Sequence, residues 1–329
     1  MTEEIGMLDT RAELLEALTM PYDRFEAEIT SRAKALWRAR GDRLQGVAMA
    51  GFSNVCRNQC LYCGMRAANQ IPRFRLEPEQ VLLWAGEARA QGFGRLFLTS
   101  GEDPKYGFDK LLRMVEGAAA LGFRVTLACG EFDAAQYAEL KAAGAVEYVV
   151  KFEMSNPESF NRLNPSSDFA RRMAAIEAVQ ASGMRLASGN IIDWPGQTLE
   201  ELAEDILLTQ RLGVSWAPVV PYLPAANTPL AQEGHRGSTE LALREIAILR
   251  LLLPEADITG GQPGKDLTRG FSDVEGNLNA LAAGANLLFT DLLPATLARE
   301  FQVVDHRVLK GVEHLRSMAE RSGMELHLD

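Results

Sequence analysis

The stretch GVAMAGFSNVCRNQCLYCGMR, residues 46–66, joins an apolar segment directly to three closely spaced cysteines. The apolar part is short and bounded by polar residues, as in a strand that is buried on both faces. Cys56, Cys60 and Cys63 follow in the spacing C-x-x-x-C-x-x-C, and the chain has one further cysteine, Cys129. The sequence therefore predicts a buried strand whose following loop carries three thiols.

The same alternation continues outward from this stretch, because short aliphatic segments are followed by longer amphipathic ones. Strands are predicted at residues 46–52, 95–99, 124–128, 147–152, 185–192, 214–222, 257–260 and 286–290. Helices are predicted at residues 77–92, 107–121, 134–143, 168–182, 198–212, 239–253, 273–283 and 305–322. Eight such pairs predict an α/β fold, a (β/α)8 TIM-type barrel, with a doubly wound sheet as the alternative.

Glycines mark the ends of several predicted helices. Gly122, Gly144, Gly183 and Gly213 each lie between a predicted helix and the next strand. A residue that can adopt a positive φ often caps a helix at this point, so these glycines support the count of pairs. We expect an N-terminal helical extension in residues 1–44 and a single barrel domain in residues 45–329.

Composition limits the classes of partner. The chain has 329 residues, a hydrophobic fraction of 47%, a formal net charge of -10 and a pI near 5.1. Proteins that bind nucleic acid usually carry a basic face, so we expect no nucleic-acid partner. The acidic start MTEEIGMLDT does not resemble a signal peptide, and no segment approaches the roughly 20 apolar residues that span a membrane. We therefore expect a cytoplasmic protein without a membrane partner, in which the cysteines do not form disulfides.

Three thiols in one loop suit a cluster better than a single metal ion. In parallel barrels the loops after the strands form one face, which carries the site. Four cysteines fully ligate a [4Fe-4S] cluster or a zinc ion, so three leave one iron of a cluster open to another ligand. A zinc site completed by a fourth donor such as Cys129 and a C-x-x-C redox pair are the alternatives.

The cysteine spacing, with the aromatic Tyr62 just before the last cysteine, resembles the signature of the radical S-adenosylmethionine (SAM) enzymes. The segment LTSGEDP after the second predicted strand is similar to the GGE motif of that superfamily. The resemblance implies one [4Fe-4S] cluster held by the three cysteines, and SAM bound to its open iron. It also implies that Gly101 and Glu102 hold the amino group of SAM, a task that suits a carboxylate beside a glycine that permits close backbone approach.

Two later segments, KFEMSNPESFNRLNPSSDFARR and GNIIDWPGQTLEEL, resemble the subgroup of biotin synthase, the [FeFe]-hydrogenase maturase HydE and the methylornithine synthase PylB. In that subgroup the position of Glu153 meets the SAM ribose, and the position of Arg172 binds the SAM carboxylate. Arginine suits this role because its planar guanidinium pairs with a carboxylate through two hydrogen bonds. The positions of Ile191 and Ile192 flank adenine.

The resemblance implies an oxygen-sensitive enzyme. A reducing partner such as a flavodoxin or ferredoxin would deliver an electron, and cleavage of SAM would give methionine and a 5′-deoxyadenosyl radical that abstracts hydrogen from a small-molecule substrate. With Cys129 alone outside the motif, the chain cannot build an auxiliary cluster of the kind that needs several further cysteines, which disfavours sulfur insertion. We expect Cys129 to be a small buried side chain.

The segments divide between the maturase and the synthase, and both patterns are interrupted. Pro218, Gly261 and Pro263 stand where the synthase has substrate-binding side chains, and Lys151 stands where the maturase has an arginine. We therefore expect a different small polar, amino-acid-like substrate and a carbon-skeleton rearrangement or C–C cleavage. A HydE-like maturase and a non-catalytic iron-sulfur or zinc protein are the alternatives. Candidate substrate contacts are the polar residues of the predicted loops: Asp103, Glu131, Lys151, Tyr222, Asp266, Arg269 and Asp291.

Overall fold

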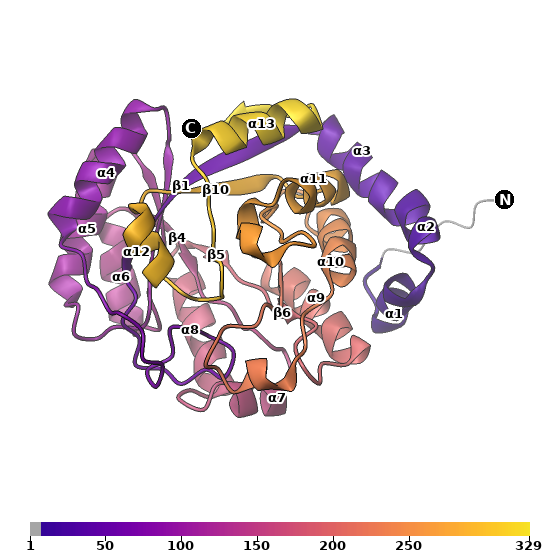
Figure 1. The fold of residues 1–329 in the computed structure, drawn as a ribbon, viewed down its shortest axis with the longest axis horizontal. Coiled ribbons are helices and arrows are strands. Elements are labelled where there is room, and N and C mark those ends of the chain that lie inside the picture. The colour runs from indigo at the N-terminus through magenta and orange to yellow at the C-terminus, as the bar shows by residue number, and fades with distance from the viewer. Residues whose placement is uncertain (1–7) are drawn as a thin grey trace.

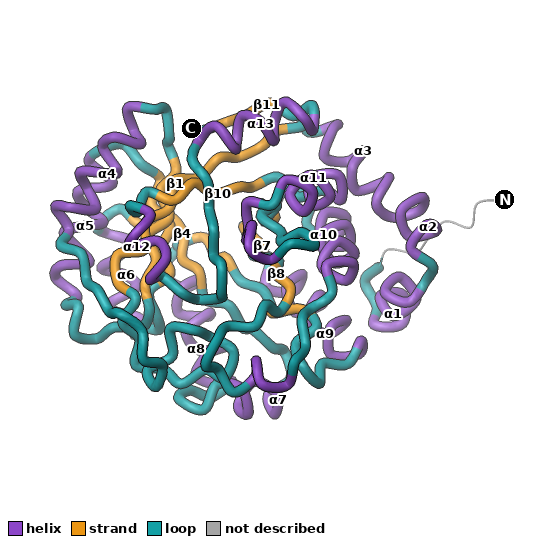
Figure 2. The backbone as a smooth tube through the Cα atoms, viewed as in Figure 1, coloured by secondary structure: helices purple, strands orange, loops and turns teal. Residues whose placement is uncertain are grey.

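A ring of parallel strands organises the part of the chain that the computed structural model describes, residues 8–329 (Figures 1 and 2). Neighbouring strands run in the order β10, β1, β2, β3, β4, β5, β7, β9, and a parallel bridge from Thr259 to Leu287 joins the last strand to the first. The bounds are β1 (Arg43–Ser53), β2 (Arg95–Ser100), β3 (Arg124–Ala128), β4 (Ala145–Val149), β5 (Arg185–Ala187), β7 (Trp216–Ala217), β9 (Asp257–Ile258) and β10 (Leu287–Asp291). The predicted barrel is confirmed.

Helices cover the outside of this ring, and seven of the predicted eight lie close to their expected positions. The helices that follow the strands are α4 (Pro78–Ala90), α5 (Phe108–Ala120), α6 (Ala134–Ala142), α8 (Phe169–Ala181), α9 (Leu199–Leu212), α10 (Thr239–Leu252), α11 (Val274–Ala283) and α13 (Val312–Ser322). The glycines expected at helix ends have positive φ angles: 85° at Gly122, 113° at Gly144, 79° at Gly183 and 59° at Gly213. The helix-ending glycines predicted from the sequence therefore have the expected backbone conformation.

The predicted extension is helical where it is described, and residues 1–7 lie outside the described part. It contains α1 (Arg11–Thr19), α2 (Tyr22–Phe25), a π-helical turn (Glu26–Thr30) and α3 (Ser31–Ala39). Helix α1 packs on α9, and α3 packs on α10. Arg244 of α10 anchors the extension, because its guanidinium donates hydrogen bonds to the carbonyl oxygens of Ala17 and Met20 at 2.9 Å each.

Two of the predicted strands are each divided into two pieces. Beyond β5 and β7 the chain forms β6 (Ile191–Ile192) and β8 (Val220–Pro221), which pair with each other in a separate small sheet. Pro218 lies between β7 and β8 and has no N–H group to donate, so a continuous ladder cannot pass this point. The break turns the segments that follow Ala187 and Ala217 toward the face that carries the loops.

The predicted helix at residues 305–322 is wrong in its first part. Residues 301–311, here called the C-terminal strap, are not helical and cross the strands between α12 (Ala295–Glu300) and α13 (Figure 1). His306 has a φ of 52°, which interrupts helical geometry. Arg307 pairs with Asp291 at the end of β10, and Leu309 packs on the cluster inside the barrel. These tertiary contacts outweigh the local periodicity.

Several short elements were not predicted. They are α7 (Pro157–Leu163), α12, β11 (Glu325–His327) and two 3-10 helices (Leu230–Glu233 and Leu267–Ser272). Strand β11 pairs in parallel with the start of β1, so the end of the described chain closes the face opposite the functional loops. Within the described residues, no helix combines the length and the apolar composition that spanning a membrane requires.

The core has an inner and an outer part. A small apolar cluster fills the barrel, and it contains Val47, Met49, Phe97, Ala187, Trp216 and Leu287. A much larger cluster lies between the strands and the surrounding helices. With the interior filled by side chains, the loops after the strands are left to build the site.

Candidate functional site

The loop after β1 carries the three cysteines of the motif, and their side chains are half-buried. Burial and the nearby Cys56 raise the pKa of the Cys60 thiol to about 12, and burial with the nearby Cys60 raises the pKa of Cys63 further. The three thiols therefore lie close enough to influence one another. A metal that binds them must displace their protons, so cluster assembly itself is coupled to pH.

The buried Asn54 fixes both ends of this loop, and sequence reasoning missed it. Its amide nitrogen donates to the carbonyl oxygens of Pro72 at 2.8 Å and Glu300 at 2.7 Å, and its amide oxygen accepts from the backbone N–H of Phe74 at 2.7 Å. The side chain is fully buried. One amide thus fastens the start of the loop to its end and to α12, which stabilises the shape that presents the cysteines.

The second strand ends against the start of the cysteine loop, where the N–H of Gly101 donates to the carbonyl oxygen of Ser53 at 3.0 Å. A Cβ atom on Gly101 would collide with the carbonyl oxygen of Val55 and with Cβ of Cys56, so only glycine fits here. Glu102 accepts hydrogen bonds from Arg57 Nε at 2.7 Å and Asn58 Nδ2 at 3.0 Å. The carboxylate predicted to bind the SAM amino group therefore lies beside the cluster loop and already has protein partners.

Asp103, the neighbour of Glu102, serves a different set of contacts. Its carboxylate accepts from Ser53 Oγ at 2.9 Å, and Arg75 holds it through two nitrogens at 2.6 and 2.9 Å. Its side chain is only 2% exposed. The predicted substrate contact is thus a link between β1, β2 and the end of the cysteine loop in this structure.

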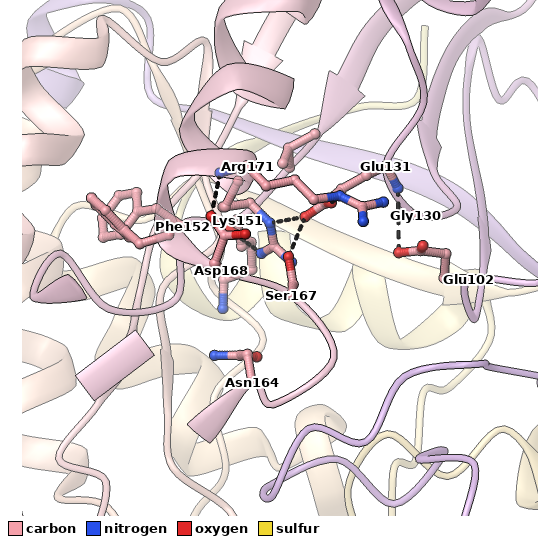
Figure 3. A network of polar contacts seen from close by, with 12 residues as sticks. Glu102, Gly130, Glu131, Lys151, Phe152, Asn164, Ser167, Asp168 and Arg171 are labelled. Atoms are coloured by element: carbon pink, nitrogen blue, oxygen red, sulfur yellow. Dashed lines mark hydrogen bonds and ion pairs between the residues drawn. The ribbon is translucent and has the colours of Figure 1, made fainter. Parts of the chain in front are cut away.

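Glu131 is the centre of a charged network on the neighbouring loop (Figure 3). It accepts from Arg172 Nε at 2.7 Å, pairs with Arg171 Nε at 2.8 Å, and accepts from Ser167 Oγ at 3.4 Å. Arg172 Nη1 also donates to the carbonyl oxygen of Lys151. Within residues 8–329, Nη2 of Arg172 has no hydrogen-bond acceptor, so one edge of this buried guanidinium remains available for a carboxylate.

Tyr62 is half-buried between the cysteine loop and the end of α7. Its hydroxyl donates to Asn164 Oδ1 at 2.7 Å, and burial raises its pKa well above the ordinary value. The ring packs on the apolar cluster that also contacts Ile191, while Ile192 is fully buried in the main core. Tyr62 and Ile191, both predicted cofactor contacts, are therefore brought to one apolar surface.

Glu153 combines an ion pair with unusual backbone geometry. Lys151 Nζ lies 3.0 Å from Glu153 Oε2, and the φ angle of Glu153 is 61°. A positive φ is costly for a residue with a side chain and persists where surrounding contacts enforce it. Here the backbone of Glu153 accepts from the N–H of Ile191 at 2.9 Å and donates to Gly189 at 3.0 Å. These two hydrogen bonds hold Glu153, the predicted ribose contact, against the β5–β6 segment.

The buried side chain of Glu245 contacts the β5–β6 segment through Asn190. Asn190 Nδ2 donates to Glu245 Oε2 at 3.2 Å, and both residues are at most 1% exposed. Burial raises the pKa of Glu245 to about 8, assisted by the negative charge of Asp205. The amide oxygen of Asn190 and the second carboxyl oxygen of Glu245 are buried without partners, so a proton on Glu245 supplies a donor that this pair lacks.

The raised pKa of Glu245 predicts that the free energy of unfolding depends on pH. The pKa of Glu245 is about 8 when folded and near its ordinary value of 4.5 when unfolded, so the folded state keeps a proton that the unfolded state releases between these values. The free energy of unfolding should therefore fall as pH rises through this window and level off above it. Denaturant melts across the window should show a smaller fall for Glu245→Gln, and parallel curves would contradict the assignment.

The remaining predicted substrate contacts are spread over three loops. Tyr222 is buried beside Trp194, whereas Asp266 and Arg269 are 51% and 63% exposed and pair with each other at 3.4 Å. Asp291 is buried and accepts from both terminal nitrogens of Arg307 at 2.9 Å. Arg307 was missed, because the sequence pattern assigned its segment to a helix. It brings a cation to the mouth of the barrel.

Cys129 has the environment expected of a small buried side chain. Its sulfur lies 3.3 Å from the hydroxyl of Tyr148, and burial raises the pKa of its thiol to about 12. It is 5% exposed at the end of β3. Within residues 8–329, no three His, Cys, Asp or Glu side chains are arranged to hold a single metal ion.

Comparison with known proteins gives consistent relatives. The model of the "Radical SAM superfamily" matches residues 51–209. The [FeFe] hydrogenase maturase subunit HydE of Thermotoga maritima is 31% identical over 301 residues, 91% of this chain and 85% of that protein. The 3-methylornithine synthase of Methanosarcina acetivorans is 27% identical over 83% of this chain and 77% of its own length. A biotin synthase of Beijerinckia indica is 29% identical, with coverage of 82% and 85%.

Solved structures show the same fold. The crystal structure of methylornithine synthase (PylB) has a TM-score of 0.83 at 24% identity, and the match covers 97% of this chain and 94% of that one. A structure of the [FeFe]-hydrogenase maturase HydG has a TM-score of 0.80 at 19% identity, with coverage of 95% and 71%. At this identity the match concerns the arrangement of strands and helices.

The residues at the barrel mouth suit the cofactors of this group, a [4Fe-4S] cluster and SAM. Three cysteines from one loop would provide the thiolates, and Gly101 gives the space for a second loop to approach them. The free edge of Arg172 and the carboxylate of Glu153 offer a cation and an anion beside Cys60, where both charges influence its thiol. From its fold, its cysteine loop and its relatives, this chain belongs to the radical SAM superfamily, in the group that contains HydE, 3-methylornithine synthase and biotin synthase.

Proposed function

We propose that this enzyme abstracts hydrogen from a small, zwitterionic, amino-acid-like substrate and catalyses a carbon-skeleton rearrangement or C–C cleavage. When bound, the reduced cluster and SAM supply a 5′-deoxyadenosyl radical, the species that removes hydrogen from an unactivated carbon. The residues of the chain have to bind the substrate, orient it toward this radical and exclude water.

The observation that carries this proposal is the presence of two ion pairs at the mouth of the barrel, one buried and one half-buried. Arg307 and Asp291 are 6% and 4% exposed, and Lys151 and Glu153 are 19% and 16% exposed. An amino acid carries a carboxylate and an ammonium, and neighbouring charges of both signs complement such a molecule. Among the predicted substrate contacts we therefore favour Lys151 and Asp291, and we add Arg307.

The C-terminal strap supports the proposal, because radical chemistry requires a closed site. The backbone N–H of Gly64 donates to the carbonyl oxygen of Val303 at 3.0 Å, and Asp305 accepts from the backbone N–H of Ala226 at 2.9 Å. Thr290 Oγ1 donates to the carbonyl oxygen of Lys310 at 2.9 Å. The strap thus touches the cysteine loop, the loop after β8 and the end of β10, and its contacts close one side of the mouth.

A maturase that acts on a metal-bound precursor is the second candidate. The 31% identity with HydE over 91% of this chain favours it, since the other reported relatives are less similar. Sulfur insertion is disfavoured, because the fourth and last cysteine of the chain is buried against Tyr148 rather than grouped with other thiols. We infer a reductant such as a flavodoxin or ferredoxin for either candidate.

The test is hydrogen transfer from labelled substrates. The reconstituted protein is incubated without oxygen with SAM, dithionite and a pool of fully deuterated amino acids, and 5′-deoxyadenosine is analysed by mass. Deuterium in that product, absent from the Cys60→Ala control, would support the proposal. The amino acid that loses deuterium in the same incubation would be the hydrogen donor. Cleavage of SAM without deuterium from any amino acid would reject the substrate class, and failure to cleave SAM under all conditions would favour a non-catalytic protein.

A further inference from the structure

Arg73 lies near the end of the cysteine loop, and within the described part of the chain its guanidinium donates only to backbone carbonyls. Nη1 donates to the carbonyl oxygens of Asn54 at 2.7 Å and Met65 at 2.8 Å. Nη2 donates to the carbonyl oxygens of Arg66 at 2.7 Å and Asn69 at 3.0 Å. One guanidinium therefore holds four backbone carbonyls of the same loop.

These carbonyls lie on both sides of the cysteines. Asn54 precedes Cys56 by two residues, whereas Met65 and Arg66 follow Cys63 by two and three residues. A side chain that joins the two flanks limits how far the flanks can separate, and so restricts the distance between the first and last thiol. Lysine could not reproduce this arrangement, because an ammonium offers three donors from one point whereas guanidinium offers five from a planar fork.

Among the described residues, the charge of Arg73 has no carboxylate partner. Within residues 8–329 it forms no ion pair, although its neighbours Arg57 and Arg75 pair with Glu102 and Asp103. The guanidinium lies close enough to Cys56 and Cys63 to interact electrostatically with both side chains. An unpaired cation that is bonded only to carbonyl oxygens of a metal-binding loop is balanced best by an anion held in that loop.

We propose that Arg73 positions the cluster loop and raises the reduction potential of the cluster. Reduction adds one negative charge to a cluster that its thiolates already make anionic, and a fixed cation nearby stabilises that charge. The electron comes from the external reductant, and no bond of Arg73 is made or broken. The residue therefore sets how readily the enzyme accepts the electron that starts each cycle.

The experiment compares Arg73→Gln with Arg73→Lys by reductive titration monitored by electron paramagnetic resonance, in the absence of any substrate. One unit charge about 10 Å from another changes an equilibrium by roughly tenfold at an effective dielectric constant of about 20. Tenfold corresponds to about 59 mV for one electron. We expect Arg73→Gln to shift the potential to more negative values by this order, and Arg73→Lys to stay near the wild type while losing iron faster to a chelator.

Arg89 provides a matched control. It also donates to backbone carbonyls, of Leu121 at 3.2 Å and Phe93 at 3.1 Å, but it lies on α4 rather than in the cysteine loop. Arg89→Gln should reduce stability without moving the potential.

An unchanged potential in Arg73→Gln with a full cluster would overturn the proposal. If that variant cannot hold a cluster, Arg73→Lys decides, since a wild-type potential supports the role of charge and a shifted one contradicts it. Loss of the cluster from both variants would mean that Arg73 only stabilises the structure of the loop, and this result would also overturn the proposal. The readout is a potential measured without substrate, so it does not depend on the proposed reaction.

Discussion

Cys60→Ala is expected to abolish both the visible absorbance of the cluster and the cleavage of SAM. Two remaining thiolates cannot retain a cubane, because each of the three cysteines would ligate a different iron and the fourth iron has to stay open for SAM. Cys60 is also the middle cysteine of the loop, and its thiol interacts electrostatically with both Cys56 and Arg172. Iron and sulfide analysis after anaerobic reconstitution, with 5′-deoxyadenosine measured by chromatography, provides the check.

Cys129→Ala is the matched control for this prediction. It removes the one cysteine outside the loop, whose sulfur contacts the Tyr148 hydroxyl at 3.3 Å. This variant should keep its iron and its SAM cleavage, with at most a modest loss of stability from the small cavity that it creates. Retention of a cluster by Cys60→Ala together with its loss from Cys129→Ala would mean that the donors are wrongly assigned.

The strands and outer helices could be predicted because their signals are local. Short aliphatic segments, amphipathic segments and helix-ending glycines each occur within a few residues, and the packing of a barrel agrees with them. Helix α7 had a local signal that was not used, since Asn156 caps it and Pro157 occupies its first turn. Its seven residues were assigned to a loop because the window for helical periodicity is longer than the helix.

The C-terminal strap, and the hydrogen bonds by which Asn54 and Arg73 fix the cysteine loop, could not be predicted in the same way. Val308, Leu309, Val312 and Leu315 have the spacing of an amphipathic helix, yet Leu309 is drawn into the barrel and Arg307 to Asp291. Those partners are distant in sequence, so no local pattern reports them. Asn54 and Arg73 likewise donate to backbone carbonyls. Every residue has a backbone carbonyl, so the sequence does not show which of them will accept a hydrogen bond. Motif resemblance found the candidate cofactor contacts, but it could not show what else Glu102 and Asp103 bind.

The strongest prediction for SAM binding concerns Arg172. In this structure its Nε bonds to Glu131 and its Nη1 to the carbonyl oxygen of Lys151, while Nη2 is free within the described residues. Its guanidinium also lies 5.1 Å from the centre of the Phe160 ring, which fixes the plane of the fork. Such a side chain offers a carboxylate an oriented donor without further loss of conformational freedom.

Arg172→Ala should therefore weaken SAM binding by roughly 10- to 100-fold, since a hydrogen bond to a charged group contributes about 1.5–3 kcal/mol. Iron content should stay the same, because the cysteines are untouched and Glu131 keeps Arg171 at 2.8 Å as a partner. Equilibrium binding of SAM to the reconstituted protein measures the effect. Arg171→Ala is the control, as this side chain is 50% exposed and should change SAM affinity little. Both arginines pair with Glu131, but only Arg172 is proposed to contact SAM directly. Equal losses of affinity in the two variants would therefore show that the ion pairs with Glu131, and not the free edge of Arg172, determine SAM binding.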